Sequence, residues 1–506
     1  MAKPELYDVA IVGLGPTGAT LANLLGLCGL SVLVLERESG IYGLPRAVHF
    51  DDEVMRVFQT IGVAEEVEIS TRVNVGMRFV DPDGKLLLDW PRPADVTPQG
   101  WHASYRFHQP DLETVLRKAL DRYPQVEVRT GTDVRIVEDR GTHVDLVFEA
   151  TGSSIQETAS ARYVVGCDGA RSLVRRTMGC GMDDLGFNER WLVVDVILKK
   201  DKPELGNHSI QFCDPHRPAT YCRSPGMRRR WEITVRDDED SEDIATSQSV
   251  WHLLSRWLTP EEADIERRAV YTFHSTLARK WRDGRLLIAG DAAHQTPPFM
   301  GQGMCTGIRD AANLAWKLAD TIRAKTDADL LESYQQERMP HARTYIETAI
   351  RLGGLINTLG TGEALDAAFS QSDGAARMES IAPRLGPGLA TFSNGPVGRP
   401  AVQPRLSDGQ LMDDAIGYGP VLLVRDSLLE EVNDWPIPLL TANTEPAVAV
   451  CLEELQTGAV LVRPDRYVLG LAGSTKEMKE LQSRAKYLFS VNSGRVSPSA
   501  QRAPAP

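Results

Sequence analysis

Three glycine-rich segments, far apart in the chain, each directly follow a short apolar run. They are residues 13–18 (GLGPTG), 166–172 (GCDGARS) and 290–294 (GDAAH). The preceding runs, residues 7–12, 163–165 and 285–289, are typical of buried parallel strands. Parallel strands of an open sheet end at a common edge, and α/β proteins bind ligands outside that edge. The three segments therefore predict an α/β domain that holds one extended ligand.

The first segment has the surroundings of a dinucleotide site. Gly13, Gly15 and Gly18 stand between an apolar strand and a helical run, where glycine permits a tight turn, close approach to a pyrophosphate, and close packing of helix and strand. The phosphates would then lie at the positive end of the helix. A second strand, residues 31–35, ends at Glu36, whose carboxylate can accept hydrogen bonds from an adenosine ribose. This segment alone does not distinguish FAD from NAD.

The other two segments favour a flavin dinucleotide. Asp168 and Asp291 each follow a strand, where a carboxylate can hold a ribityl or ribose hydroxyl of a cofactor anchored at the first segment. Gly301 and Gly303 precede a helical run over residues 304–319, so backbone N–H groups there can face an anion. A reduced isoalloxazine carries such a negative charge. We therefore expect FAD, bound along its whole length.

Composition limits the partners and the location. The net charge of −13 argues against nucleic acid or an anionic membrane as partner. No charged-then-apolar leader precedes Tyr7, and no apolar run approaches the length of about 18 residues that a membrane span needs. The seven cysteines include no C-x-x-C pair, and the His and Cys residues show no metal-ligand spacing. We expect a cytoplasmic protein without a metal.

Further motifs make the chain resemble the single-component FAD-dependent aromatic hydroxylases, the group typified by para-hydroxybenzoate hydroxylase. The resemblance is strongest to the 3-(3-hydroxyphenyl)propionate hydroxylase branch. Besides the three segments and Glu36, it rests on residues 45–53 (PRAVHFDDE), 301–304 (GQGM), 307–311 (GIRDA) and 313–318 (NLAWKL), and it covers residues 5–345. The chain departs from the family at Cys305, where relatives usually carry Asn.

The resemblance implies an α/β fold in which a Rossmann-like FAD-binding domain is interleaved with an antiparallel β-sheet substrate domain, followed by a C-terminal thioredoxin-like domain lacking C-x-x-C. The expected FAD-binding parts are residues 1–76, 104–187 and 279–345, and the substrate-domain parts are residues 77–103 and 188–278. A helical segment and linker would occupy residues 346–404, the thioredoxin-like domain 405–492, and a disordered tail 493–506. Residues 421–424, 447–451 and 458–462 are predicted strands of the C-terminal domain.

The resemblance also implies the chemistry. Such enzymes reduce bound FAD with NADH or NADPH and then transfer one oxygen atom of O2 to a phenolic ring through a flavin C4a-hydroperoxide. The implied substrate is 3-(3-hydroxyphenyl)propionate or a related small phenolic acid of aromatic catabolism, and a homodimer is compatible with the family. Two alternatives stay open: a hydroxylase that tailors polyketides or antibiotics, and a non-catalytic flavin-binding redox sensor.

Site residues follow from the same motifs. The expected catalytic residues are Arg46, His49, Tyr221 and Pro298, and the expected substrate-binding residues are Gln211, Tyr221, Arg223 and Pro298. The expected cofactor-binding residues are Gly13, Gly15, Pro16, Thr17, Gly18, Glu36, Arg37, Arg46, Gln109, Asp168, Gly169, Gly290, Asp291, Gly301, Gln302, Gly303 and Met304.

A phenol reacts best as its phenolate, so a base is expected within hydrogen-bond reach of the substrate. The sequence offers His49, His208, Tyr221 and His294 for this role without choosing among them. Residues 228–230 (RRR) are expected to form a solvated hairpin end.

The variants Gly15→Ala and Asp291→Ala test the cofactor assignment. A methyl group at residue 15 would occupy space that the pyrophosphate needs, and loss of the Asp291 carboxylate would remove an acceptor for a cofactor hydroxyl. Both variants should purify without yellow flavin, as absorbance spectra of the purified proteins would show. Flavin-replete spectra from both variants would refute the assignment.

Overall fold

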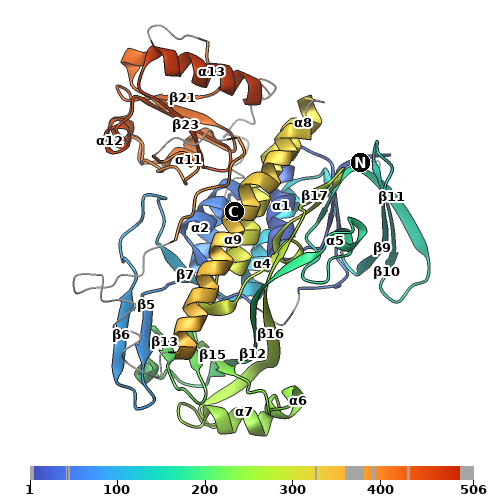
Figure 1. The fold of residues 1–506 in the computed structure, drawn as a ribbon, viewed down its shortest axis with the longest axis vertical. Coiled ribbons are helices and arrows are strands. Elements are labelled where there is room, and N and C mark those ends of the chain that lie inside the picture. Colours follow the sequence, from blue (N-terminus) through green and yellow to red (C-terminus); the bar gives the residue numbers. More distant parts are fainter. Residues whose placement is uncertain are drawn as a thin grey trace.

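A computed structural model describes residues 5–41, 43, 46–324, 328–358, 381–389, 395–429 and 434–489. The tail expected over residues 493–506 and part of the expected linker lie outside these residues. The described chain forms two large sheets and a smaller C-terminal sheet, and the long helices α8 (Gly303–Ala324) and α9 (Ala328–Thr358) run through the middle of the molecule (Figure 1).

The first large sheet carries the three glycine-rich segments. Its main path has the order β17-β18-β11-β1-β2-β8, and the strands from β18 to β8 run parallel. The three segments follow the carboxyl ends of β1, β11 and β18, as the sequence predicts. The strands are β1 (Tyr7–Val12), β2 (Val32–Leu35), β8 (Val126–Arg129), β9 (Thr132–Asp139), β10 (Val144–Ala150), β11 (Gln156–Gly166), β17 (Arg282–Asp283) and β18 (Leu286–Ile288).

Helix α1 (Pro16–Leu27) packs closely against α8 because two glycines leave room for it. A Cβ atom at Gly307 of α8 or at Gly290 would collide with the side chain of Thr17, and one at Gly18 would collide with the carbonyl of Gly13. The other helices of this part are α2 (Asp52–Ile61), α3 (Ala64–Ile69), α4 (Gln109–Ala119) and α5 (Leu173–Thr177). The glycine-rich segments thus bring the start of α1, the start of α8 and the end of β18 together.

The second large sheet has the order β19-β16-β12-β15-β14-β13-β5-β6 and is antiparallel except for the pair β13 and β5. Its longest strand, β12, crosses the boundary expected between residues 187 and 188. The strands are β5 (Gly76–Val80), β6 (Leu86–Pro91), β12 (Met182–Leu198), β13 (Ser209–Phe212), β14 (Ala219–Arg223), β15 (Arg228–Thr234), β16 (Ala263–Ala278) and β19 (His294–Gln295). Helices α6 (Ser241–Ile244) and α7 (Ser247–Leu254) lie beside this sheet (Figure 1).

A three-stranded sheet of order β3-β7-β4 connects the two large ones. Its strands are β3 (His49–Asp51), β7 (Ser104–Arg106) and β4 (Arg72–Val73). Arg106 at the end of β7 donates a hydrogen bond of 2.5 Å to Ser209 Oγ on β13 of the second large sheet. Residues of β3 and β7 are buried, so this small sheet lies inside the molecule.

The C-terminal sheet has the order β21-β20-β22-β23, with β20 parallel to β21 and the other pairs antiparallel. Its elements are α11 (Met412–Ile416), β20 (Val421–Val424), β21 (Leu439–Thr441), α12 (Pro446–Glu454), β22 (Ala459–Val462), β23 (Val468–Ala472) and α13 (Thr475–Phe489). The strand predicted over residues 447–451 is wrong, because this segment belongs to α12. Pro446 suits the first turn of a helix, and the buried Val448, Cys451 and Leu452 share one helical face.

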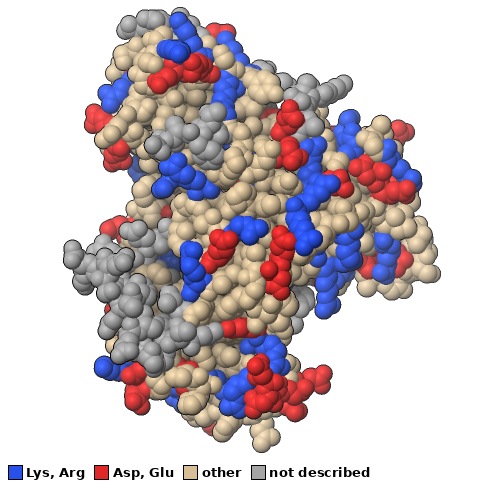
Figure 2. Space-filling model, in the orientation of Figure 1, with Lys and Arg blue, Asp and Glu red and all other residues tan. Residues whose placement is uncertain are grey.

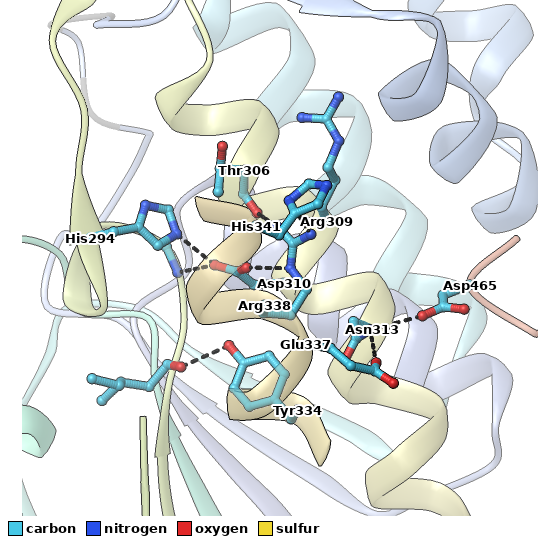
Figure 3. A network of polar contacts seen from close by, with 12 residues as sticks. His294, Thr306, Arg309, Asp310, Asn313, Tyr334, Glu337, Arg338, His341 and Asp465 are labelled. Atoms are coloured by element: carbon cyan, nitrogen blue, oxygen red, sulfur yellow. Dashed lines mark hydrogen bonds and ion pairs between the residues drawn. The ribbon is translucent and has the colours of Figure 1, made fainter. Parts of the chain in front are cut away.

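Buried polar contacts fasten this C-terminal part to α8 and α9, and Figure 3 shows Asn313 hydrogen-bonded to both Glu337 and Asp465. The carboxylate of Glu337 on α9 accepts hydrogen bonds from Lys317 Nζ at 2.7 Å, from Asn313 at 3.0 Å, and twice from Arg463 at 2.8 Å. Arg463 follows β22 and also pairs with Asp465. Burial alone would raise the pKa of Glu337, but Arg463 and Lys317 lower it below its usual value. The carboxylate is therefore held ionised inside the protein.

The surface carries both signs of charge. On the face seen in Figure 2, Lys and Arg side chains are interspersed with Asp and Glu side chains. Among the described residues, no helix is long and apolar enough to cross a membrane. The described His, Cys, Asp and Glu side chains also include no group of three or more that could hold a metal ion.

Replacing Arg463 by Met tests how much the buried pairs contribute to stability. The variant leaves Glu337 with fewer partners in a buried position, and such a change typically destabilises a protein by about 3–5 kcal/mol. Thermal unfolding should show a clearly lower midpoint for Arg463→Met than for Arg425→Met, which changes an exposed arginine in the same region. Equal midpoints for the two variants would contradict the assigned role.

Candidate functional site

The turn between β1 and α1 leaves an open cradle at the start of the helix. Gly13 has a φ of +100°, and a Cβ atom there would collide with the backbone of Cys167. By contrast, no heavy atom lies within 4 Å of the position that a Cβ atom would take at Gly15. Pro16 occupies the first turn of α1, where no N–H is required. The free N–H groups and the helix dipole therefore face open space that suits a pyrophosphate.

Glu36, at the end of β2, lies against this turn. Its carboxylate accepts hydrogen bonds from the backbone N–H of Leu14 at 2.6 Å and of Glu38 at 2.9 Å. The neighbouring Arg37 has a side chain that is 71% exposed and pairs with Glu38. Glu36 thus lies against the turn that precedes α1, and Arg37 lies at the surface beside it.

The loop that carries Arg46 is fixed from two sides. Gln109 Oε1 accepts hydrogen bonds from the backbone N–H groups of Arg46 and Ala47, each at 2.9 Å. Arg230 donates to the Arg46 carbonyl at 2.9 Å. The Arg46 guanidinium, itself half-exposed, reaches Asp291 at 3.2 Å. Two predicted residues that are 245 positions apart therefore meet.

The second glycine-rich segment presents a carboxylate with unused capacity. Asp168 Oδ2 accepts a hydrogen bond from the N–H of Leu173 at 2.6 Å, but the buried Oδ1 has no partner among the described residues. Burial raises the pKa of this carboxyl. Gly169 beside it has a φ of +75°, which favours glycine.

The loop before α8 closes the cradle. Gly301 has a φ of +63°, and a Cβ atom there would lie 2.9 Å from Cβ of His49. Gly303 starts α8, where a Cβ atom would lie 4.0 Å from Cβ of Thr296, and Met304 is half-buried. The Gln302 side chain instead bonds inward, to Asp51 and Arg309, so only its backbone is available to a ligand. Cys305 is buried, with its Sγ 3.6 Å from the Gly301 carbonyl.

These features fit FAD. The open start of α1 suits a pyrophosphate. Glu36 and Oδ1 of Asp168, which has no partner among the described residues, can accept hydrogen bonds from hydroxyl groups. The half-exposed Arg46 and Asp291 pair beside the same opening. Gly301 allows the loop before α8 to approach His49 closely. A nucleotide with two ends, held at two helix starts, matches this arrangement.

A cavity adjoins the loop of residues 298–301. The predicted residues His49, Gln211, Pro298 and Gly301 line it. Its other lining residues are Val48, Asn74, Met77, Arg92, Arg106, Trp191, Thr220, Cys222, Glu232, Phe299 and Met300. The cavity thus lies between the second large sheet and the start of α8. Phe299 packs edge-on against Trp191 at 5.8 Å between ring centroids, which closes part of the wall with aromatic rings.

His49 is the histidine that faces this cavity. Its Nε2 lies 2.7 Å from Ser104 Oγ, which also accepts a hydrogen bond from Asn74 at 3.0 Å. Burial and the neighbouring Arg92 and Arg106 lower the pKa of His49 to about 3. The imidazole is therefore neutral near pH 7 and has one nitrogen able to accept a proton.

The other candidate bases lie elsewhere. His294 is fully buried and hydrogen-bonded to Asp310 at 2.7 Å (Figure 3). His208 is half-buried before β13 and does not line the cavity. Tyr221 is 1% exposed and packs on Trp231 at 5.0 Å, inside the core of the second large sheet. Burial raises the pKa of Tyr221 to about 12.

The structure corrects three sequence-based expectations about the second large sheet. Tyr221 and Arg223 do not line the cavity, because alternate residues of a strand face opposite sides and Thr220 and Cys222 occupy the cavity side of β14. Arg223 instead bonds to Gly206 and Asn207. Residues 228–230 are not a solvated end, because Arg229 and Arg230 are each 1% exposed and Arg230 pairs with Asp195 at 2.6 Å.

Arg92, Arg106 and Glu232 are the ionisable cavity residues that the sequence analysis missed. Burial and repulsion from Arg106 lower the pKa of Arg92 to about 10. Burial raises the pKa of Glu232, against the attraction of Arg230 at 3.8 Å. The alternation of side chains between the two faces of β14 and β15 could have indicated that Glu232 faces the cavity. Arg92 and Arg106 stand at strand ends and belong to no motif.

Comparison with known proteins identifies the family. A family described as "FAD binding domain" matches residues 6–349. The chain is 38% identical to a probable NADH-specific resorcinol 4-hydroxylase of Rhodococcus jostii, over 100% of this chain and 98% of that protein. It is 40% identical to a 3-(3-hydroxy-phenyl)propionate/3-hydroxycinnamic acid hydroxylase of Burkholderia vietnamiensis, over 69% of this chain and 63% of that protein. The match thus spans less than two thirds of that second relative.

Solved structures share the fold. The flavin-dependent monooxygenase PieE, solved in complex with FAD and substrate, superposes with a TM-score of 0.81 at 19% identity, over 96% of this chain and 100% of that chain. Aklavinone-11 hydroxylase, solved with FAD and aklavinone, gives a TM-score of 0.80 at 22% identity, over 96% and 100% of the two chains. The family match, the full-length relative and the cradle agree. The chain therefore belongs to the FAD-binding-domain family, among its FAD-dependent aromatic hydroxylases.

Proposed function

We propose that this protein uses NADH and O2 to hydroxylate a small phenol that carries a second polar group in the meta position. Resorcinol and 3-(3-hydroxyphenyl)propionate, which the names of the relatives contain, both have this pattern. The single observation that carries the proposal is the cavity beside residues 298–301, because it places a partly polar space directly against the loop that precedes α8. The full-length relative supports NADH as the reductant.

FAD, when bound, supplies the redox chemistry that couples oxidation of NADH to insertion of one oxygen atom of O2 into the ring, with the other atom leaving as water. The residues of this chain do the rest. Gly13, Gly15, Glu36, Asp168 and Asp291 are proposed to hold the cofactor. Arg46, fixed by Gln109, is proposed to lie beside it, and Pro298 to border the substrate ring.

His49 is the proposed acceptor of the phenol proton. It faces the cavity, it is neutral, and its Nε2 is joined to Ser104 and through it to Asn74. A proton taken up by His49 can therefore be shared in a hydrogen bond with the Ser104 hydroxyl, which Asn74 holds in place. The aromatic wall of Trp191 and Phe299 excludes water from the reacting ring, which limits wasteful release of peroxide.

We also propose that the C-terminal part is a thioredoxin-like domain. Its strand order, with one parallel and two antiparallel pairs, supports this, and residues 405–492 contain no C-x-x-C for redox chemistry. Apart from the limit between residues 187 and 188, which β12 crosses, the expected domain limits, a cytoplasmic location and a homodimer remain part of the proposal.

NADH oxidation by the FAD-loaded protein tests the function. Resorcinol and 3-(3-hydroxyphenyl)propionate should each be compared with no ligand, with NADPH in place of NADH, and with H2O2 measured alongside. We expect at least one of the two phenols to stimulate NADH oxidation, with little H2O2 and a product gaining one oxygen by mass. No stimulation by any small phenol, together with turnover of a larger polycyclic substrate, would overturn the proposed substrate class.

The variant His49→Gln tests the proton acceptor. Gln keeps a hydrogen-bonding group but accepts no proton, so the hydroxylation rate should fall by about 10²–10⁴-fold while FAD content stays unchanged. Because the pKa of His49 is about 3, the wild-type kcat/KM should show no limb from imidazolium formation between about pH 5 and about pH 8. A wild-type limb at about pH 6.5 that disappears in His49→Gln would contradict the low pKa of His49. An unchanged hydroxylation rate in His49→Gln would contradict its role as the proton acceptor.

A further inference from the structure

Two guanidinium groups line the cavity without an ion pair to a carboxylate in the described structure. Asp51 and Asp52 attract Arg92 only from a greater distance. Arg92 follows β6 and Arg106 ends β7. Among the described residues, neither Arg92 nor Arg106 forms an ion pair within 4.0 Å. Two other buried arginines do: Arg230 pairs with Asp195 and Arg309 with Asp51, each at 2.6 Å. The cavity therefore holds buried positive charge that no ion pair among the described residues neutralises.

The same two side chains have unused hydrogen-bond donors. Arg106 is 8% exposed and donates to Ser209, but its buried Nε finds no acceptor among the described residues. The buried Nε of Arg92 also has none. A buried donor without an acceptor is unfavourable, and a buried charge without a partner more so. An anion that enters the cavity would reduce both free-energy costs, because its oxygens accept the free hydrogen bonds and its charge offsets that of the guanidiniums.

The register of the small sheet places these charges beside the proposed proton acceptor. Arg106 on β7 is directly opposite His49 on β3, and it is also directly opposite Arg72 on β4. Directly opposed residues project from the same face of a sheet. His49, Arg106 and Arg72 therefore form a row, and an anion held by Arg106 lies close to the imidazole.

Glu232 offsets this charge only in part, because Arg106 attracts it without forming an ion pair in the described structure. It is the acidic residue among the cavity-lining residues, and its nearest cationic partner is Arg230, at 3.8 Å, on the same strand. Burial raises its pKa, so its negative charge is weakened. Burial and Arg106 lower the pKa of Arg92 only to about 10, so that guanidinium remains charged near neutral pH.

We propose that Arg92 and Arg106 together bind an anionic oxygen of the substrate and so select phenols that carry a negative charge. This inference rests on the proposed function and deepens it. The charge comes from one of two sources, a side-chain carboxylate or a ring phenolate, and both present oxygen acceptors to the same donors. The two arginines are specificity-determining residues, and the sequence-based candidate Arg223 is replaced by them.

Binding measurements on the FAD-loaded protein separate charge from shape. Calorimetric titration would compare 3-(3-hydroxyphenyl)propionate with its neutral primary amide, which has nearly the same size. We expect the acid to bind at least about tenfold more tightly than the amide. Arg92→Met and Arg106→Met should each weaken binding of the acid by about 10- to 100-fold, and binding of the amide by less than about threefold.

Matched variants keep this test falsifiable. Arg78→Met removes an arginine from the neighbouring β5 whose pair with Asp89 is half-exposed, and it should leave both affinities within about threefold of wild type. Arg92→Lys and Arg106→Lys retain the charge and should keep part of the preference for the acid. FAD content and the midpoint of thermal unfolding show whether each Met variant is folded. If a Met variant does not fold, the Lys variant at the same position takes its place in the comparison. That Lys variant is then expected to weaken binding of the acid more than binding of the amide.

A phenolate is detected by its ultraviolet absorption. If it is the anion that is bound, resorcinol should show a phenolate spectrum with the wild-type protein and lose it with Arg92→Met and Arg106→Met. The inference is overturned if the acid and the amide bind equally to wild type and resorcinol shows no phenolate spectrum. It is also overturned if both Met variants retain wild-type selectivity. Charge-selective binding without turnover would refute the proposed function alone, whereas turnover without charge selectivity would refute the anchor alone.

Discussion

The carboxylate of Asp310 is the contact on which the arrangement of the site depends. It is fully buried on α8, and it accepts hydrogen bonds from the backbone N–H of Gly290 at 3.1 Å, from His294 at 2.7 Å and from Arg338 at 2.9 Å (Figure 3). Burial alone would raise its pKa, but His294 and Arg338 lower it below its usual value. One ionised side chain therefore holds the third glycine-rich segment, α8 and α9 in a single relative position.

The polar contacts continue from Asp310 to the cavity through the C-terminal part. Arg338 contacts His341 at 2.8 Å, and Tyr467 donates a hydrogen bond of 2.5 Å to Glu53. Glu53 pairs with Arg309, which in turn pairs with Asp51, each at 2.6 Å. Asp51 ends β3, the strand that begins with His49. Tyr467 and the arginines of this chain of contacts are buried, so the C-terminal part stabilises the strand that presents His49 rather than forming a separate appendage.

Sequence motifs mark the glycines of the cradle more clearly than they mark the residues of the cavity, and the reason is physical. Close approach of backbones requires glycine, so Gly13, Gly18 and Gly301 leave a readable pattern. A strand, by contrast, has two faces that the sequence does not assign. On β14, Cys222 faces the cavity, whereas the predicted residue Tyr221 faces the core on the other side of the sheet. Arg92 and Arg106 are ordinary strand-end arginines that only the three-dimensional pairing brings together. The strand predicted over residues 447–451 was wrong for a similar reason, because a short apolar run does not distinguish a strand from a helix.

The charges of the cavity also couple substrate binding to proton transfer. In the free protein, Arg92 and Arg106 help to keep the pKa of His49 near about 3, which makes the imidazole a weak base. An anionic oxygen bound to the two guanidiniums offsets their repulsion toward an imidazolium, so the pKa of His49 rises in the complex. By thermodynamic linkage, binding of the substrate anion to Arg92 and Arg106 therefore makes His49 a stronger base toward the substrate hydroxyl. A neutral phenol would fill the same space without this effect, because it leaves the two positive charges uncompensated. In the proposed mechanism, therefore, the electrostatic selection of the substrate and the activation of its ring hydroxyl arise from the same pair of arginines.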